Sequence, residues 1–259
     1  MGCSNGKENQ MDKVEVNSFS SIQKVIAVMS GKGGVGKSTV TSLLATSLSR
    51  KGKKVGILDA DFTGPSIPKV FGLNEKMAKT GPMGILPEVT AGGIKIMSIN
   101  LLMEKKDDPV IWRGPILSNT VKQFFSEVVW GDLDYLFIDL PPGTGDVPLT
   151  IMQSLPINGI VVVSSPQELV KLIVTKSIKM AKMLNVPLIG LVENMSYLEC
   201  PDCKKIIKLF GESRIEEVSL ETGIPVLARL PIDPEFAALC DSGKVEDYTK
   251  AEILLNDID

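Results

Sequence analysis

The segment Gly31-Lys32-Gly33-Gly34-Val35-Gly36-Lys37-Ser38 constrains the fold more than any other part of the chain. It matches the pattern G-x-x-x-x-G-K-[ST] and lies directly between an apolar run at residues 25–29 and a helical pattern at residues 37–50. A strand, a glycine-rich turn and a helix in this order let backbone N–H groups surround a triphosphate at the positive end of the helix dipole. We therefore predict a nucleotide-binding P-loop, in which Lys37 reaches the outer phosphates and Ser38 holds Mg²⁺. The predicted nucleotide-contacting residues of the loop are Gly33, Gly34, Val35, Gly36, Lys37, Ser38 and Thr39.

The rest of the chain alternates short β-branched runs with longer helical patterns, which is typical of βαβ units. We predict an α/β fold, doubly wound, with a mostly parallel sheet and helices on both faces. Expected strands are residues 25–29, 54–58, 94–99, 135–138, 160–163, 188–192 and 226–230. Expected helices are residues 37–50, 115–130, 147–155, 167–184, 214–222 and 234–241. Residues 62–93, rich in Gly and Pro, are expected to form a long connection of the kind that is either disordered or functional.

Domain organisation and location follow from composition. The 259 residues are 44% hydrophobic with a net charge of -3, so we expect one P-loop domain over residues 22–259 after a disordered tail at 1–21. The acidic balance argues against nucleic acid as a partner. No apolar run is long enough to span a bilayer, and residues 1–17 lack the apolar centre of a signal peptide. We therefore expect a cytoplasmic protein with no membrane partner.

Three aspartates end predicted strands and are candidates for the chemistry of hydrolysis. Asp59 and Asp61 follow the second strand, and Asp139 closes the apolar run 135–138 in the Walker B arrangement. We predict that Asp139 and Asp59 join Ser38 around Mg²⁺ and that Asp61 positions the attacking water, with Asp59 as its alternate. The simpler alternative for Asp139 is a strand-end cap. In the following loop, the N–H of Gly143 is a candidate donor to the terminal phosphate.

The chain has four cysteines and no histidine, which excludes every His-ligated metal site and every Cys-His or Ser-His nucleophile pair. Cys200 and Cys203 form a C-x-x-C pair, which supplies half of the ligands of a tetrahedral zinc or an iron–sulfur cluster. Two copies of the chain meeting at a twofold axis would complete such a site. A structural zinc site is an alternative to the cluster, and a redox-active dithiol is a less favoured third interpretation of the pair. Cys240 lies in an apolar helical context and is expected to be a buried small hydrophobe.

Lys32 places a second cation inside the P-loop, where most such loops carry a neutral residue. A solvated lysine is the simplest interpretation. With Lys37, however, it makes the loop resemble the deviant Walker A loop of the ParA, MinD and nitrogenase iron protein superfamily. That resemblance implies that Lys32 reaches across a dimer to the partner's nucleotide, so that ATP hydrolysis depends on dimer formation.

Several further motifs, in the same order, resemble the Mrp/ApbC family of iron–sulfur carrier ATPases over residues 22–245. The matching segments are residues 29–39, 56–61, 64–68, 112–115, 134–146, 165–168, 193–197 and 200–203. The resemblance implies a homodimer that binds ATP and Mg²⁺, carries a bridging 4Fe-4S cluster on Cys200 and Cys203 of both subunits, and transfers it to apoproteins. The cluster-binding segment would lie near residues 194–210. Base-binding residues implied by the resemblance are Asn194, Pro231 and Asp233.

The chain departs from the family pattern at two positions that bear on partner contacts. Lys204 stands where a glycine commonly follows the second cysteine, and Ile173 stands where many members have an acid. Two other functions remain as alternatives: a MinD/ParA-like positioning ATPase and a zinc-stapled regulatory ATPase. The first predicts a basic amphipathic C-terminal helix, but residues 245–259 carry a net negative charge, with five acidic residues against one lysine. For the carrier reading, we expect ATP to close the dimer through Lys32 and the Gly143 loop and so to change the exposure of the sulfur ligands.

Overall fold

The computed structural model describes residues 13–62, 64, 66–103, 114–166 and 170–250. Eight strands form the central sheet in the order β12-β9-β8-β1-β7-β2-β6-β5. All neighbouring strands are parallel except β5 and β6, which confirms the predicted fold class. The bounds are β1 Ser21–Ser30, β2 Val55–Asp59, β5 Glu88–Val89, β6 Lys95–Ser98, β7 Asp132–Asp139, β8 Gly159–Ser164, β9 Leu188–Glu193 and β12 Val226–Arg229.

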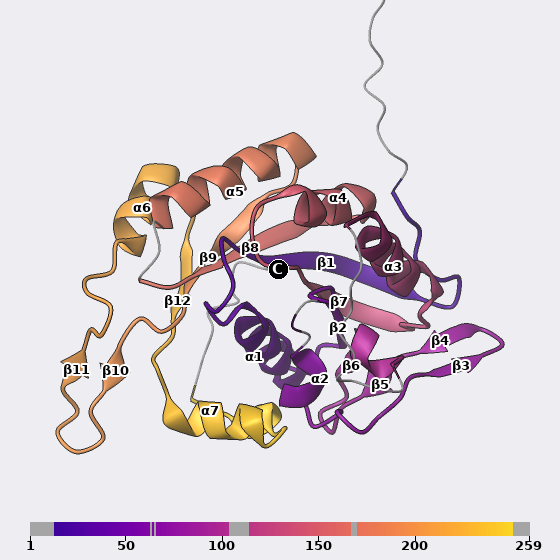
Figure 1. The fold of residues 1–259 in the computed structure, drawn as a ribbon, viewed down its shortest axis with the longest axis horizontal. Coiled ribbons are helices and arrows are strands. Elements are labelled where there is room, and N and C mark those ends of the chain that lie inside the picture. Colours follow the sequence, from indigo (N-terminus) through magenta and orange to yellow (C-terminus); the bar gives the residue numbers. More distant parts are fainter. Residues whose placement is uncertain (1–12, 63, 65, 104–113, 167–169, 251–259) are drawn as a thin grey trace, which may run out of the picture.

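Helices cover both faces of the sheet (Figure 1). On one face lie α1 (Lys37–Arg50), α2 (Ile67–Val70) and α7 (Pro234–Asp241). On the other lie α3 (Gly114–Glu127), α4 (Asp146–Ser154), α5 (Val170–Leu184) and α6 (Ile215–Thr222). Two short 3₁₀ helices, η1 (Ile99–Leu101) and η2 (Val245–Asp247), complete the set within the described residues.

The central strand β1 supplies both hydrophobic cores. Its side chains alternate, because successive residues of a strand point to opposite faces of the sheet. Val25, Ala27 and Met29 join the cluster under α3 to α6, whereas Ile26 and Val28 join the cluster under α1. All five are buried. An uninterrupted apolar run is what a parallel strand covered on both faces requires, and it explains the run before the P-loop.

Two small hairpins were not predicted. β3 (Lys79–Gly81) and β4 (Gly84–Leu86) pair within the connection at residues 62–93, and β10 (Leu198–Glu199) and β11 (Ile206–Ile207) enclose the cysteine pair. Strands of two or three residues are too short to show a period in the sequence. We call the β10–β11 unit, with its connecting turn, the cysteine hairpin. It projects from the end of the sheet beyond β12 (Figure 1).

The folded part begins before residue 22. The N–H of Val14 donates to the carbonyl of Ser154 (2.9 Å), and both Val14 and Val16 pack against the core under α3 to α6. Residues 1–12, with Cys3, lie outside the described residues, as do the motif residues 112–113 and 167–168. None of the described helices has the length and apolar character that crossing a bilayer needs.

Candidate nucleotide and cysteine sites

The predicted nucleotide-site residues lie at the carboxyl edge of the parallel strands, whereas the two predicted cluster ligands lie in the cysteine hairpin. The P-loop leaves the end of β1 and turns into α1 at Gly36, whose φ of 79° lies in the left-handed region that favours glycine. A Cβ on Gly36 would lie 2.1 Å from Nδ2 of Asn194, so this position also needs glycine for space. The loop borders a cavity of about 360 Å³. Its lining residues are Ser30, Lys32, Gly33, Gly34, Gly36, Lys37, Ser38, Thr39, Asp61, Gly64, Ser66 and Pro142.

Asp139 organises the floor of this site. The Lys37 ammonium lies 2.9 Å from its Oδ2, and the hydroxyl groups of Ser38 and Thr41 donate to Oδ2 (2.5 Å) and Oδ1 (2.7 Å), respectively. Asp139 is fully buried at the end of β7. Hydroxyl and carboxylate oxygens are the ligands that Mg²⁺ prefers, so Ser38 and Asp139 fit the predicted metal position. The arrangement also holds the Lys37 ammonium at the P-loop cavity.

The two aspartates that follow β2 differ in position. Asp61 lines the cavity, with its Oδ2 3.7 Å from Nζ of Lys37. Asp59 does not line it: the carboxylate is buried and accepts hydrogen bonds from the Ser98 hydroxyl (3.1 Å) and the Asp61 N–H (3.2 Å). Burial and the neighbouring charge of Asp139 raise the pKa of Asp59 well above its usual range. The geometry therefore favours Asp61 over Asp59 for direct contact with water or nucleotide.

Gly143 has a φ of 100°, and its N–H donates to the carbonyl of Ser30 (2.9 Å). The predicted hydrogen bond from Gly143 to a terminal phosphate therefore requires this loop to rearrange, since the donor is occupied in the present conformation. Pro142, from the same loop, does line the cavity. Lys32 is exposed at the mouth of the cavity, and its carbonyl accepts a hydrogen bond from the Ser30 hydroxyl (3.0 Å).

The three predicted base-binding residues follow β9 and β12, at the same edge of the sheet. The amide of Asn194 donates to the carbonyl of Val35 (3.0 Å) and does not line the P-loop cavity. Pro231 and Asp233 line a second cavity of about 560 Å³, on the side of the cysteine hairpin.

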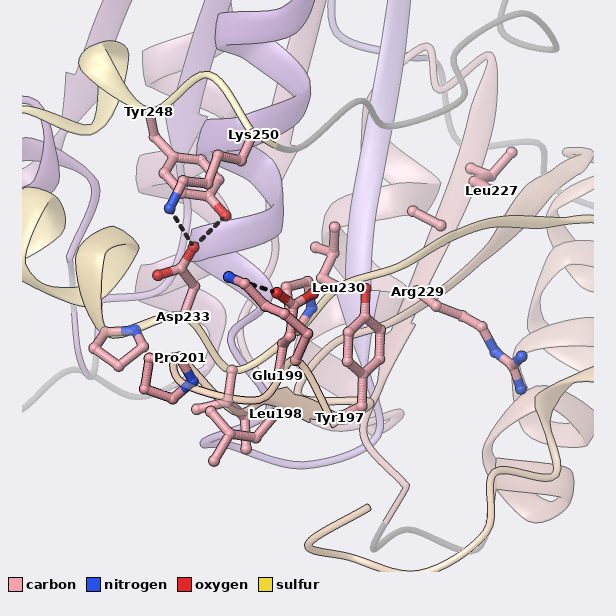
Figure 2. A pocket seen from close by; sticks show the side chains of 15 residues that line it. Tyr197, Leu198, Glu199, Pro201, Leu227, Arg229, Leu230, Asp233, Tyr248 and Lys250 are labelled. Carbon is pink, nitrogen blue, oxygen red and sulfur yellow. Dashed lines mark hydrogen bonds and ion pairs between the residues drawn. The ribbon is translucent and has the colours of Figure 1, made fainter. Parts of the chain in front are cut away.

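Asp233 already has structural partners in that second cavity. Its side chain caps α7 by accepting from the N–H of Glu235 (2.8 Å). In Figure 2, Tyr248 and Lys250 both point toward the Asp233 carboxylate, at 3.0 Å for the Tyr248 hydroxyl and 3.6 Å for the Lys250 ammonium. A nucleotide base would therefore meet Asp233 as part of a network that also anchors the segment after α7.

Cys200 and Cys203 lie in the turn of the cysteine hairpin. The N–H of Cys200 donates to the carbonyl of Lys205, and the N–H of Lys204 donates to the carbonyl of Cys200, both at 3.0 Å. Lys204 has a φ of 60°, which explains why glycine suits this position: the turn needs a left-handed residue. Its ammonium pairs with Glu199 (3.1 Å).

The turn leaves both sulfurs accessible and polarises one of them. Cys203 is exposed and Cys200 is partly exposed. Hydrogen bonds from the N–H groups of Cys203 and Asp202, and from the Cys203 thiol, lower the pKa of Cys200. A thiolate is the form that binds a metal or cluster.

Within the residues that the structure describes, one copy of the chain brings together only two of the four sulfurs that such a site needs. Among the described residues, no three cysteine or acidic side chains gather closely enough to hold a metal ion. Cys240 is not near enough to complete a set of three with Cys200 and Cys203. It lies on α7, packs against the core under α1, and has a pKa raised to about 11 chiefly by burial. Cys240 packs against the core as predicted, but it is only partly buried rather than fully buried.

Sequence reasoning missed the role of Glu193, the last residue of β9. Its carboxylate is fully buried and accepts hydrogen bonds from the hydroxyl groups of Ser196 and Ser213. The Arg229 Nε lies 3.9 Å from it. The available signal was an acid at the end of an apolar strand, beside the predicted base-binding Asn194.

Comparisons with known proteins show which family the chain resembles. A family model described as "ParA: NUBPL iron-transfer P-loop NTPase" matches residues 21–256. An iron-sulfur cluster carrier protein of Methanocaldococcus jannaschii is 52% identical over 90% of this chain and 81% of its own. The cytosolic Fe-S cluster assembly factor CFD1 of Eremothecium gossypii is 42% identical over 88% of this chain and 84% of its own.

A solved nucleotide-binding protein from Archaeoglobus fulgidus, in complex with ADP, is also similar. It is 48% identical, covers 88% of this chain and 89% of its own, and superimposes with a TM-score of 0.81. Three observations together identify the family: the match of the family model over most of the chain, the high identity to these relatives, and the P-loop geometry. The chain belongs to the ParA/NUBPL family of iron-transfer P-loop NTPases.

Proposed function

We propose that this protein is an ATP-binding iron–sulfur cluster carrier. It works as a homodimer in which Cys200 and Cys203 of both copies hold one bridging 4Fe-4S cluster, which is then transferred to recipient apoproteins. The observation that carries the proposal is the cysteine hairpin itself. It presents two accessible sulfurs, one of them with a lowered pKa. The hairpin that carries them projects beyond β12, the edge strand of the sheet that also carries the P-loop (Figure 1). The names of the relatives support the same cargo.

The nucleotide half of the proposal rests on the P-loop cavity. Lys37 and the loop glycines fit the phosphates, and the ADP complex of the Archaeoglobus fulgidus relative supports nucleotide binding. Mg²⁺ held by Ser38 and Asp139 would neutralise phosphate charge. Asp61 is assigned to position water for slow hydrolysis. Lys32 is assigned to the nucleotide of the partner copy, which makes hydrolysis depend on the dimer.

The proposed dimer follows from the number of cysteine ligands that a cluster needs. A cubane cluster needs four protein ligands, and each copy offers two accessible sulfurs in this hairpin. A twofold axis through paired cysteine hairpins would supply the remaining two. The recipients are apoproteins that need a cluster, and we propose a cytoplasmic location, in keeping with the cytosolic relative.

Anaerobic reconstitution tests this function directly. Iron and acid-labile sulfide assays should give about four of each per dimer. The matching absorbance band should be lost in Cys200→Ser and Cys203→Ser. Cys240→Ser is the matched control, because its sulfur packs against the core and should leave loading unchanged. Equal loading of wild type and both hairpin variants would contradict the proposal, and zinc without sulfide in protein purified without oxygen would favour the zinc-stapled alternative.

A further inference from the structure

Glu193 lies between the two sites and is used by neither. Its Oε1 accepts a hydrogen bond from the Ser213 hydroxyl (2.7 Å), its Oε2 accepts one from the Ser196 hydroxyl, and the Arg229 Nε lies 3.9 Å from Oε2. A buried carboxylate is costly unless it is paired and hydrogen-bonded. Because its partners come from three separate segments, Glu193 fixes those segments relative to one another.

The two serines bracket the cysteine hairpin. Ser196 precedes β10, and Ser213 lies between β11 and α6. These residues before and after the cysteine hairpin, which carries Cys200 and Cys203, therefore both contact the Glu193 carboxylate. Figure 1 shows that β10 and β11 extend away from the central sheet. These strands pair with each other, and this pairing does not attach them to the central sheet.

Backbone hydrogen bonds to the segment after β12 also hold the start of the cysteine hairpin. The N–H of Ser196 donates to the carbonyl of Leu230 (2.9 Å), and the N–H of Ile232 donates to the carbonyl of Tyr197 (2.7 Å). These bonds secure the outgoing end of the hairpin. On the returning side, the Ser213 hydroxyl also accepts from the N–H of Ile215 at the start of α6. The hydrogen bond from Ser213 to Glu193 thus links the two ends directly, and Arg229 adds a longer link through its ion pairs with Glu193 and Glu216.

The residue after Glu193 contacts the nucleotide loop. Asn194 donates to the carbonyl of Val35, and its Nδ2 fills the space where a Cβ on Gly36 would lie. Asn194, which contacts the P-loop, is thus adjacent in sequence to Glu193, which holds the two ends of the cysteine hairpin. A displacement of the loop at residues 35 and 36 has a short, contiguous route to the cysteines.

We propose that Glu193 is a positioning residue that sets the placement of the cysteine pair and makes it respond to nucleotide in the P-loop. This inference rests on the proposed function, because it assigns a purpose to the link between its two sites. Glu193 touches neither nucleotide nor cluster; it acts through Ser196 and Ser213.

Hydrogen exchange of the full-length chain, with and without a non-hydrolysable ATP analogue and Mg²⁺, tests the proposal. In wild type, the analogue should slow exchange at the P-loop and change exchange in the hairpin peptides by about fivefold or more. In Ser196→Ala/Ser213→Ala, the P-loop response should persist while the hairpin response falls to less than about twofold. Ser196→Thr/Ser213→Thr retains both hydroxyl groups and should restore the hairpin response.

Ser219→Ala is the matched control. Its hydroxyl makes a hydrogen bond of similar length, to the carbonyl of Ile224 (2.7 Å) near the same helix, but does not reach Glu193. A hairpin response that persists in the double alanine variant, or that is lost equally in Ser219→Ala, overturns the inference. So does a wild-type hairpin that ignores the analogue while the P-loop responds. Failure of the wild type to load a cluster contradicts the proposed function instead, and the exchange measurement still decides the link.

Discussion

The side-chain amide of Asn194 donates to the backbone carbonyl of Val35 across 3.0 Å, which joins the end of β9 to the P-loop. The same Nδ2 would lie 2.1 Å from a Cβ on Gly36. Gly36 therefore faces two separate constraints, a left-handed backbone and a crowded neighbour, and their effects can be measured apart.

Gly36→Ala should destabilise the fold by about 2 kcal/mol, with about 1 from the left-handed backbone and about 1 from the lost Asn194 hydrogen bond. Nucleotide affinity should fall by about tenfold or more, because the first turn of α1 would shift. Urea unfolding and nucleotide titration measure the two effects. Gly52→Ala is the control: Gly52 has a φ of 80° with nothing within 4 Å of its Cβ position, so only the backbone cost applies. Equal destabilisation by the two variants would show that Asn194 does not crowd Gly36.

Replacing Asp61 and Asp139 one at a time should distinguish a residue that acts only in hydrolysis from one that also supports nucleotide binding. Asp61→Asn should lower the rate of ATP hydrolysis by about 100-fold while leaving nucleotide affinity within a few fold, since Asp61 is assigned to position water. Asp139→Asn should also weaken Mg²⁺-dependent binding and lower the free energy of unfolding by about 1–3 kcal/mol, because Asp139 is buried against Lys37, Ser38 and Thr41. Single-turnover hydrolysis and calorimetric titration test the pair. Asp61→Asn with normal turnover would remove Asp61 from the mechanism.

Alkylation of the apoprotein should distinguish the cysteines by pH. Hydrogen bonds to the sulfur lower the pKa of Cys200, so its thiolate forms at lower pH than that of an ordinary cysteine. Burial raises the pKa of Cys240 to about 11, so its reactivity should still be rising above pH 10. Iodoacetamide labelling followed by peptide mass spectrometry measures both profiles. Coincident profiles for Cys200 and Cys240 would contradict the geometry of the hairpin turn.

Much of the nucleotide site is predictable from sequence because its residues follow strands whose ends meet at one edge. The observed bounds of α1 and α7 equal the predicted ones, and Asp139 contacts Ser38 although they lie far apart in sequence. The P-loop pattern carries this information because each of its positions has a separate physical requirement. Strand order is different: nothing local indicates that β1 lies between β7 and β8.

Other features depend on contacts that leave no local pattern. Glu193 gathers Ser196 and Ser213 through the path of the cysteine hairpin, whose strands of two residues each are invisible to periodicity. The N–H of Gly143 is occupied by Ser30, which only the folded loop reveals. The sequence did mark Lys204 as unusual, and its left-handed φ now supplies the reason.

Lys204→Gly should stabilise the cysteine hairpin, because glycine adopts the left-handed conformation at little cost whereas lysine is strained by about 1 kcal/mol. The variant also loses the exposed ion pair with Glu199, which contributes less than about 1 kcal/mol. Hydrogen exchange at the amides of Cys200 and Lys204, whose hydrogen bonds close the turn, should therefore slow. Lys205→Gly is the matched control: its backbone is not left-handed, so the added glycine flexibility should speed exchange instead. Faster exchange in both variants would mean that the ion pair, not the backbone, governs the turn.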